Sequence, residues 1–477
     1  MKVLLVNPLN LHKRSYVVIP NVSLGYLASA LRRSGHEVSL LDCVKDRVGF
    51  SGFSSRLADR AYDVVGFNTF TPAFSAVKEY ARRARMRLPR SLIVVGGPHP
   101  TFEPEETLRE IPEADFAFVG EAEEGLPMLV DAFGASRPLD GSAGAAALEE
   151  IPGLVWRHQG GEVRKNPRRF IEDLDKNGIP SWDLVQPETY PVAPNGIFCR
   201  HRFIAPVIAT RGCPYPCTFC GAGRSLGRKV RKRSIGNLME EIDLLAGRHG
   251  IKEIHIMDDN FTFDRGYAQA FCDALIEARK GIFWALPNGV RLDSLDAPLL
   301  ALMERSGCYS MAVGIESGNQ HVLDHIKKHL TLEVVEEKVK LIKRASRIRV
   351  TGFFILGYPI ETRQDMDRTI RFALRLPLDR ANFFNYSPFP GSAMYEELKA
   401  RRKLGALSYD DLYIHSISYS PDGLSLKEMS SYPLKAHLRF YLRPRILFNL
   451  AREIKSLDQI EVIARRAGAI LLERFKR

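Results

Sequence analysis

The chain has 477 residues, of which 45% are hydrophobic and 26% charged, a composition typical of a globular protein with two or three domains. No apolar run reaches the roughly 18 residues of a membrane span, and the N-terminus lacks a signal-peptide cleavage site. The seven cysteines, three of them in one loop, do not resemble a disulfide framework, so we expect the reducing cytoplasm as the compartment. The net charge of +12 is unevenly placed, because basic residues gather between Pro433 and Arg477. A membrane surface or a polyanion would first be sought there.

Apolar runs and amphipathic stretches alternate over residues 1–135, which we expect to form the first domain. The predicted strands are Lys2–Val6, Glu37–Leu41, Asp63–Phe67, Leu92–Val95 and Ala114–Val119. The predicted helices are Ser23–Ser34, Phe53–Ala61 and Ala73–Leu88, with Ser23 and Thr71 as caps. This alternation predicts an α/β, Rossmann-like doubly wound parallel sheet, which binds ligands at the carboxyl ends of its strands.

Polar and glycine-rich loops follow four of these predicted strands. Glycine directly after a strand lets the backbone approach a flat or phosphate-bearing ligand. The candidate ligand-binding residues in these loops are Asn7, Thr69, Gly96, Gly97, His99, Thr101, Gly120 and Glu121.

Residues 136–200 give a weaker signal, typical of a hairpin and a linker. Gly141–Ala147 is rich in Gly and Ala and predicts a surface loop, and two short strands flanking His158–Gly161 predict a hairpin. Prolines further on, Pro187, Pro191 and Pro194, predict an extended linker to the next domain.

A second β/α alternation covers residues 201–400. Its predicted strands are Phe203–Ala209, Glu253–Met257, Trp284–Asn288, Ser310–Gly314, Arg349–Leu356 and Ala381–Tyr386. We expect the chemistry at the carboxyl ends of these strands. Residues 401–477 predict a helical extension, with helices at Met394–Lys403, Leu424–Leu442, Arg445–Lys455 and Asp458–Arg474.

Three cysteines, Cys213, Cys217 and Cys220, follow the first strand of the second domain in the sequence TRGCPYPCTFCG. Thiolates at this density bind a soft metal or form disulfides. Three thiolates leave a four-iron cluster one ligand short, so that one iron is open to a small molecule. The alternative is a structural zinc site, for which His201 or His255 would supply a fourth ligand.

The spacing CxxxCxxC with Phe219 before the last cysteine resembles the signature of radical S-adenosylmethionine (SAM) enzymes. The loops GGPHPTFEPEE at Gly96–Glu106 and GEAEE at Gly120–Glu124 resemble the cobalamin-binding domain that precedes the radical SAM domain in one large subfamily. The resemblance covers nearly the whole chain. It implies a cobalamin-binding domain, a partial (β/α)6 radical SAM barrel, and three cofactors: a 4Fe-4S cluster on the three cysteines, SAM and cobalamin.

The resemblance also assigns residues to SAM. Asp258 or Asp259 would accept hydrogen bonds from its ammonium, Arg291 would bind its carboxylate, and Glu316 and Ser317 would bind its ribose. Its adenine would lie in a slot formed by Phe219 and Phe354–Gly357. For each of these residues the alternative is a structural cap or an ion pair between loops.

One departure from the subfamily concerns cobalt. Many cobalamin domains carry a DxHxxG motif whose histidine binds the metal, and this chain has none. The resemblance therefore implies cobalamin without a protein histidine on cobalt. His99 lies in the loop that the subfamily shares, where positioning of the backbone is the alternative to a role as ligand.

The implied activity is methyl transfer to an unactivated carbon of a small-molecule or lipid-like substrate, by way of a 5′-deoxyadenosyl radical and methylcobalamin. We expect flavodoxin or ferredoxin as the electron donor and no nucleic-acid partner. Near the C-terminus, apolar residues at helical spacing are typical of a core-facing helix, and a basic amphipathic helix that contacts a membrane surface is the sharper interpretation of this stripe, which consists of Ile460, Ile463, Ala464, Ala467, Ile470 and Leu471. Cobalamin-assisted ring formation and a zinc-stabilised binding protein remain as alternatives. A methylthiotransferase is excluded, because it needs three further N-terminal cysteines and this region offers only Cys43.

Overall fold

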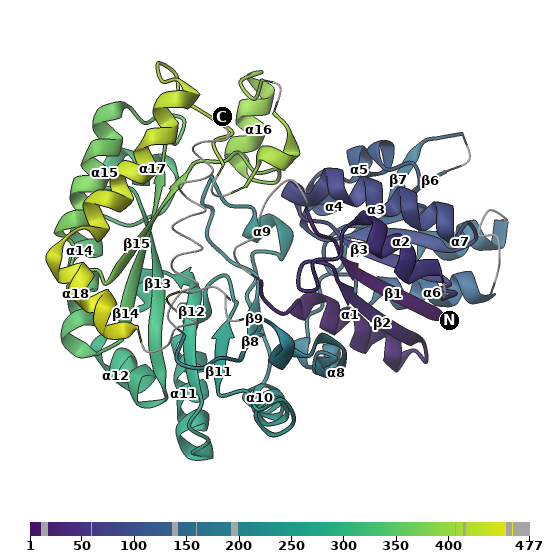
Figure 1. Ribbon diagram of the computed structural model, residues 1–477, viewed down its shortest axis with the longest axis horizontal. Helices are drawn as coiled ribbons and strands as arrows, with labels where there is room; N and C mark the ends of the chain where they lie inside the picture. Colours follow the sequence, from purple (N-terminus) through teal and green to yellow (C-terminus); the bar gives the residue numbers. More distant parts are fainter. Residues whose placement is uncertain are drawn as a thin grey trace.

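The structure is a computed structural model. It describes residues 1–10, 18–58, 60–135, 142–158, 160–191, 199–405, 407–413, 416–454 and 460. Two α/β sheets with their helices lie side by side, the first at the right of Figure 1 and the second at the left. The helix predicted at Asp458–Arg474 lies almost entirely outside the described residues.

The first sheet has seven strands in the order β2-β1-β3-β4-β5-β6-β7. Its parallel strands are β1 (Lys2–Asn7), β2 (Glu37–Asp42), β3 (Val64–Asn68), β4 (Leu92–Gly96) and β5 (Phe116–Phe118). This confirms the five predicted strands. The predicted hairpin is also confirmed, as β6 (Leu154–Arg157) and β7 (Val163–Lys165), and it continues the sheet antiparallel to β5. We therefore propose that the first domain extends to about residue 165.

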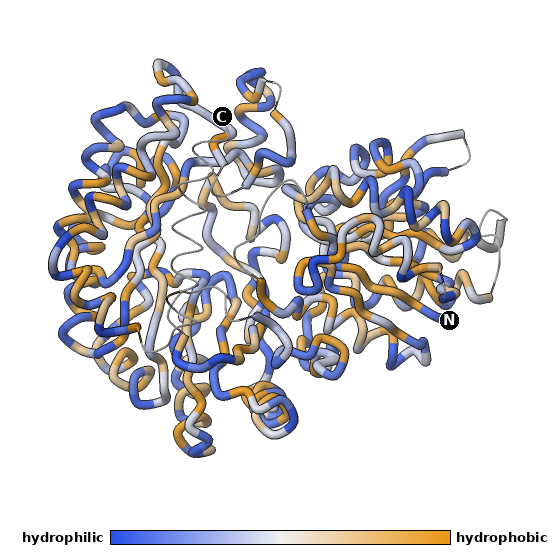
Figure 2. The backbone as a smooth tube through the Cα atoms, in the orientation of Figure 1, coloured by the Kyte–Doolittle hydropathy of each residue, from blue (hydrophilic) through white to orange (hydrophobic). Residues whose placement is uncertain are grey.

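Helices cover both faces of this sheet because its strands are apolar on both faces. In β1, Leu4 and Val6 face one core and Val3 and Leu5 the other. The first core contains α2 (Phe50–Ala58), α3 (Phe74–Arg87) and α5 (Pro104–Glu110). The second contains α1 (Val22–Arg33) and α6 (Gly125–Ala135). Figure 2 shows the apolar strands inside and the polar helix faces outside.

Local details differ from the sequence predictions in three places. Asn21, not Ser23, caps α1, since its side chain accepts a hydrogen bond from the Leu24 amide at 3.1 Å. Thr71 begins a 3-10 turn and does not cap α3. The loop predicted at Gly141–Ala147 is wrong for its described part, which belongs to α7 (Ser142–Glu149), because consecutive alanines favour a helix.

The second sheet confirms the predicted partial barrel. Six parallel strands lie in the order β15-β14-β13-β12-β11-β8. They are β8 (Ile204–Val207), β11 (Glu253–Ile256), β12 (Phe283–Val290), β13 (Cys308–Glu316), β14 (Arg349–Leu356) and β15 (Arg380–Asn385). The outer helices are α10 (Ile235–His249), α11 (Arg265–Ala278), α12 (Ala297–Arg305), α14 (Leu332–Ala345) and α15 (Arg363–Arg375).

The remaining elements are short or C-terminal. Between the sheets or beside the barrel lie α4 (Pro98–Phe102), α8 (Trp182–Val185), β9 (Thr210–Arg211), α9 (Ala222–Ser225), β10 (Arg231–Lys232) and α13 (Gln320–His325). The helical extension is α16 (Ala393–Ala400), α17 (Leu426–Tyr441) and α18 (Pro444–Glu453), and α17 packs along β15. In Figure 1, α4 and α9 face each other across the joint between the two sheets.

A buried ionic network joins the first domain to β9 and β10, which form a small two-stranded sheet on either side of the cysteine loop. Arg211, in β9, donates to Glu121 at 3.1 Å and to Glu123 at 2.6 Å, and both acids lie in the loop after β5. Arg231 donates to the second oxygen of Glu121 at 2.7 Å. Since these side chains are almost wholly removed from water, each charge requires its partner, and the network fixes how the domains meet.

A second contact at the joint is apolar. The ring of Phe102, from α4 in the first domain, packs against Gly221 after the cysteines and against Gly391 after β15. A Cβ at Gly221 would stand 3.0 Å from this ring, and a Cβ at Gly391 would collide with it. The two glycines therefore make room for a side chain of the other domain.

We predict that Glu121→Gln lowers the free energy of unfolding by about 3 kcal/mol, because Arg211 and Arg231 then lose a buried counter-charge. Glu124→Gln, in the same loop, is the matched control. Glu124 pairs with Arg169 at the surface, and its loss should change stability by less than about 1 kcal/mol. Urea titrations followed by circular dichroism measure both. Equal losses in the two variants would contradict the prediction.

Candidate active site

The three cysteines lie in the loop that follows β8, and Asp258 fixes the segment that leads into this loop. Asp258 follows β11, and its two carboxylate oxygens accept hydrogen bonds from the Ala209 amide and the Thr210 hydroxyl, each at 2.8 Å. Burial raises the pKa of Asp258 to about 7, and these hydrogen bonds act in the opposite direction. Both oxygens of this predicted SAM ligand thus position the cysteine loop.

The thiols of Cys213, Cys217 and Cys220 lie close enough to influence one another electrostatically. Burial raises the pKa of Cys213 and of Cys217, and the ammonium of Lys328 lowers both. The Ala222 amide donates to the Cys220 sulfur at 3.4 Å. Within the described part of the chain, no three His, Cys, Asp or Glu side chains already stand in a metal-binding arrangement. The fit to a cluster therefore rests on the donor set.

That donor set is three thiols. Cys43 is buried in the core of the first domain, and Cys272 and Cys308 are buried in the barrel core, where Cys308 begins β13 at the opposite end from the cysteine loop. The two histidines considered for a zinc site are engaged elsewhere. His255 contacts Glu253 at 3.0 Å, and the His201 ring stacks on Phe283 at the start of β12. Three thiols match a cluster with one open iron.

The residues predicted for the polar end of SAM differ in their surroundings. Asp259 is exposed and acts electrostatically on Cys213 and Cys220, so it is the aspartate that faces the thiols. Arg291 donates to Asp293 at 2.7 and 3.0 Å and to the Lys328 carbonyl at 2.7 Å. Its guanidinium also lies 3.8 Å from the Tyr215 ring centroid. Carboxylate binding by Arg291 stays a prediction, and its present contacts are those of a loop ion pair.

The residues predicted for ribose and adenine lie at the ends of β13 and β14. Glu316 pairs with Lys328 at 2.7 Å, and the Ser317 hydroxyl lies 3.2 Å from that of Thr369. Phe219 packs against a hydrophobic cluster that includes Tyr358. Gly357 has a φ of +78°, and Met429 of α17 occupies the space where its side chain would stand. These contacts are structural, and the roles toward SAM stay predictions.

On the side of the first domain, the predicted ligand loops come together at the carboxyl ends of β1, β3, β4 and β5. The Asn7 side chain donates to Asp42 at 3.0 Å, and the Thr69 amide donates to the Gly96 carbonyl at 2.7 Å. Gly97, with a φ of +107°, lies so close to the loop after β3 that a Cβ would stand 2.6 Å from the Asn68 side-chain oxygen. The glycine is required for this close approach.

The other predicted residues of this domain are also engaged. Thr101 donates to the Gly97 carbonyl at 2.8 Å and accepts from the Gly120 amide at 3.0 Å. Both oxygens of Glu121 are taken by the ionic network of the joint. Its predicted contact with a cofactor stays a prediction, while the observed contacts are structural.

His99 is buried within the protein. Its ring lies between Phe74 and Tyr409, with centroids 4.1 and 4.7 Å away, and burial lowers its pKa to about 4. Nδ1 lies 3.3 Å from the Thr71 hydroxyl. This packing agrees with the alternative of a positioning role for the loop after β4.

Two site residues escaped the sequence prediction. Lys328 lies beside Cys217, and Asn385 ends β15 with its side-chain oxygen buried and unpartnered among the described residues. The position of Asn385 at the end of a predicted strand was a usable signal. Lys328 offered none, because it lies in an ordinary charged stretch between two helices.

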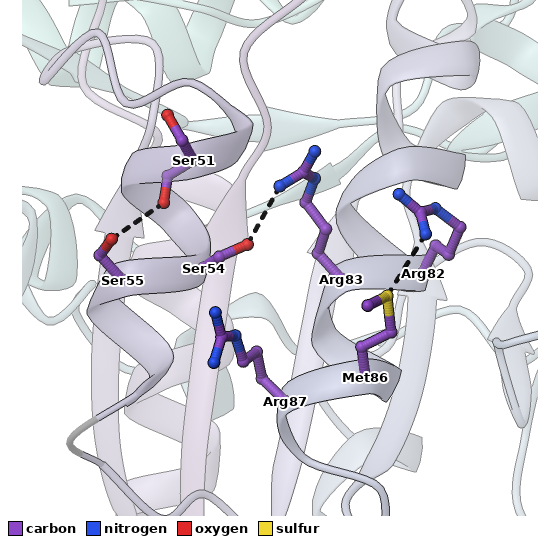
Figure 3. A pocket seen from close by; sticks show the side chains of 7 residues that line it. All are labelled: Ser51, Ser54, Ser55, Arg82, Arg83, Met86 and Arg87. Carbon is purple, nitrogen blue, oxygen red and sulfur yellow. Dashed lines mark hydrogen bonds between the residues drawn. The ribbon is translucent and has the colours of Figure 1, made fainter.

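A groove of about 620 Å³ lies between α2 and α3, lined by Ser51, Ser54, Ser55, Arg82, Arg83, Met86 and Arg87 (Figure 3). Glu79 pairs with Arg82 and Arg83. Because α3 runs back from the end of β3 to the start of β4, its last turn lies at the amino ends of the strands. The groove is therefore separate from the loops that meet the barrel.

Comparisons with known proteins agree with this architecture. Residues 12–130 match the family model of the B12 binding domain, and residues 207–373 match that of the radical SAM superfamily. An uncharacterised methyltransferase of Pyrococcus horikoshii is 31% identical over 94% of this chain and 94% of its own length. Cytidylyl-2-hydroxyethylphosphonate methyltransferase of Streptomyces wedmorensis is 29% identical over 83% of this chain and 81% of its own length.

A third relative carries a different name. Anaerobic magnesium-protoporphyrin IX monomethyl ester cyclase of Cereibacter sphaeroides is 26% identical over 93% of this chain and 71% of its own length. Among solved structures, the radical SAM methyltransferase TsrM of Kitasatospora setae, with cobalamin and a 4Fe-4S cluster bound, superposes with a TM-score of 0.67. It is 19% identical and covers 92% of this chain and 81% of its own, and this likeness shows a shared fold.

We predict that Cys213, Cys217 and Cys220 are the cysteines that hold iron. The triple Cys→Ala variant should lose bound iron, sulfide and the visible absorption of the cluster after anaerobic reconstitution, since no other thiol lies in this loop. The control changes Cys43, Cys199, Cys272 and Cys308 to Ala and should retain all three signals. Loss of iron in the control would mean that one of these cysteines is a ligand.

Proposed function

The chain belongs to the radical SAM superfamily, among its enzymes with an N-terminal B12-binding domain, and we propose that it transfers a methyl group to an unactivated carbon of a small-molecule or lipid-like substrate. When bound, the cluster with SAM supplies a radical that removes a hydrogen atom, and cobalamin supplies the methyl group. Cys213, Cys217 and Cys220 would hold the cluster, and the loops after β3, β4 and β5 would hold cobalamin.

The observation that carries the proposal is that the loops at the carboxyl ends of both sheets meet. Phe102 follows β4 and contacts Gly221 directly after the cysteines, while Glu121 follows β5 and binds Arg211 directly before them. The domain matched by the B12-binding model thus faces the cysteine loop. Such packing keeps reacting groups close together and excludes water from between them.

The chain's residues divide this work. Asp258 and Arg211 both position the segment that leads into the cysteine loop. Asp259 presents a carboxylate toward the thiols, where the ammonium of SAM would need an acceptor. Asn260 and Asn385 each leave one buried polar atom without a partner among the described residues at the carboxyl ends of β11 and β15. These atoms are suited to orient SAM or substrate in the barrel mouth.

Ring formation without methyl transfer is the second candidate. It is favoured by the similarity to the cyclase of Cereibacter sphaeroides, which extends over 93% of this chain. Methyl transfer is preferred because the two more similar relatives described above are both named methyltransferases.

The two candidates differ in the products of SAM. Methyl transfer consumes two SAM molecules for each product and gives S-adenosylhomocysteine together with 5′-deoxyadenosine. Ring formation gives 5′-deoxyadenosine without S-adenosylhomocysteine, because no methyl group is spent. We predict that anaerobic incubation of the reconstituted enzyme with reductant, cobalamin and methyl-deuterated SAM forms S-adenosylhomocysteine, measured by mass spectrometry. 5′-Deoxyadenosine alone would reverse the preference.

For partners, we propose an outside one-electron donor of the flavodoxin or ferredoxin type and, with it, the reducing cytoplasm as the compartment, which suits the three cluster thiols. Within the described parts of the chain, no helix has the length and apolar character needed to span a membrane. We also propose that α17 and α18 contact an anionic membrane surface. Leu438, Leu442, Leu447 and Phe448 are exposed there, and Arg439, Arg445 and Arg452 accompany them.

We predict that the protein floats with vesicles containing phosphatidylglycerol and less with neutral vesicles, because arginines flank the exposed apolar side chains. Leu447→Ser with Phe448→Ser should reduce the bound fraction several-fold. Met86→Ser, at another exposed apolar residue on α3, is the control and should bind as the wild type does. Flotation that is absent, or unchanged in the double variant, would refute membrane contact through these helices.

A further inference from the structure

A buried ion pair lies under the cysteine loop. Lys328 Nζ donates to Glu316 Oε1 at 2.7 Å, and both side chains are at least 90% removed from solvent. Gly314 lies against the pair, so that a Cβ there would stand 2.7 Å from the Lys328 nitrogen and would collide with the Glu316 carboxylate. The absence of a side chain at Gly314, near the end of β13, thus leaves the space that the two charged groups occupy.

The backbone around the pair is strained. Glu316, Lys327 and His329 all have left-handed φ angles, of 67°, 55° and 53°. A residue other than glycine is unfavourable in this region, so the conformation persists only where surrounding contacts determine it. Strain of this kind concentrates at functional sites.

Those contacts come from the cysteine loop and from Arg291. The Thr218 amide donates to the Ile326 carbonyl at 3.0 Å, and the Cys217 sulfur lies 3.9 Å from the Lys327 carbonyl. Arg291 donates to the Lys328 carbonyl at 2.7 Å. The segment from Ile326 to His329 is therefore held against the cysteine loop by these contacts, and it places Lys328 beside the thiols.

The charge of Lys328 acts on the thiols. Its ammonium lies close enough to Cys217 and Cys213 for a charge–charge interaction with both sulfurs, and the carbonyl of the adjacent Lys327 lies 3.9 Å from the Cys217 sulfur. Glu316 acts on Cys217 with the opposite sign. The neighbouring Lys327 is exposed. One of two consecutive lysines is therefore placed where its charge stabilises negative sulfur.

We propose that Lys328 is a positioning residue that sets the reduction potential of the iron–sulfur cluster, with Glu316 as its counterweight. A fixed cation beside the cluster stabilises the reduced form, which carries one more negative charge, and a fixed anion disfavours it. Because the pair is buried, solvent screens these effects little. The inference rests on the cluster of the proposed function and does not depend on which reaction follows.

The test measures the midpoint potential of the reconstituted protein by redox titration followed with electron paramagnetic resonance, without SAM, cobalamin or substrate. Lys328→Gln should shift the potential downward, and Glu316→Gln should shift it upward. Lys328→Arg, which keeps the charge, should stay near the wild type. Lys327→Gln is the matched control, because it removes the same charge one residue away at the surface, and its potential should equal that of the wild type.

Opposite shifts of the midpoint potential in the two buried variants distinguish an electrostatic role from a structural one. A loss of packing has no reason to shift the potential in opposite directions when a cation and an anion are removed. If Lys328→Gln fails to load iron, Glu316→Gln and the double variant Lys328→Gln/Glu316→Gln decide the question, the latter expected near the wild-type potential. Equal potentials in all variants, or shifts of the same sign, would overturn the inference. If the reconstituted wild-type protein gave no cluster signal, that result would instead contradict the proposed function.

Discussion

The guanidinium of Arg211 is the group on which the arrangement of the two domains depends. It lies two residues before Cys213 and is bound by Glu121 and Glu123 of the other domain. A guanidinium removed from water is unfavourable without its partners, and all partners are present only when the domains are docked. The same residue that leads into the cysteine loop therefore sets the position of that loop relative to the first sheet.

Within the barrel, the cysteine loop is likewise held by polar groups that are removed from water and hydrogen-bond to one another. Asp258 holds the strand end before the loop, and the segment around Lys328 holds its middle. Many residues that resemble cofactor ligands thus already bind protein groups. Arg291 and Glu316 are examples, and each combines an internal partner with a position close to the thiols.

Much of this fold was predictable from local patterns. Strand β14 agrees to the residue with its apolar run, and the spacing of the three cysteines indicated their chemistry without any structure. Partners across long separations were not predictable. Nothing near Glu121 in the sequence indicates that it meets Arg211, because the ion pair exists only after both sheets have formed. Lys327 and Lys328 cannot be told apart by residue type, and only the folded backbone leaves Lys327 exposed and buries Lys328.

The joint between the domains also has a consequence for the order of events during synthesis. Glu103 of the first domain pairs with Lys399, which follows it by 296 residues, and Phe102 packs on Gly391. N-terminal domains generally fold first on the ribosome. The first sheet is therefore complete before its partners in the joint, which run from Arg211 and Gly221 to Gly391 and Lys399, have all emerged. A bulky cofactor has this interval in which to enter without any later opening of the finished protein.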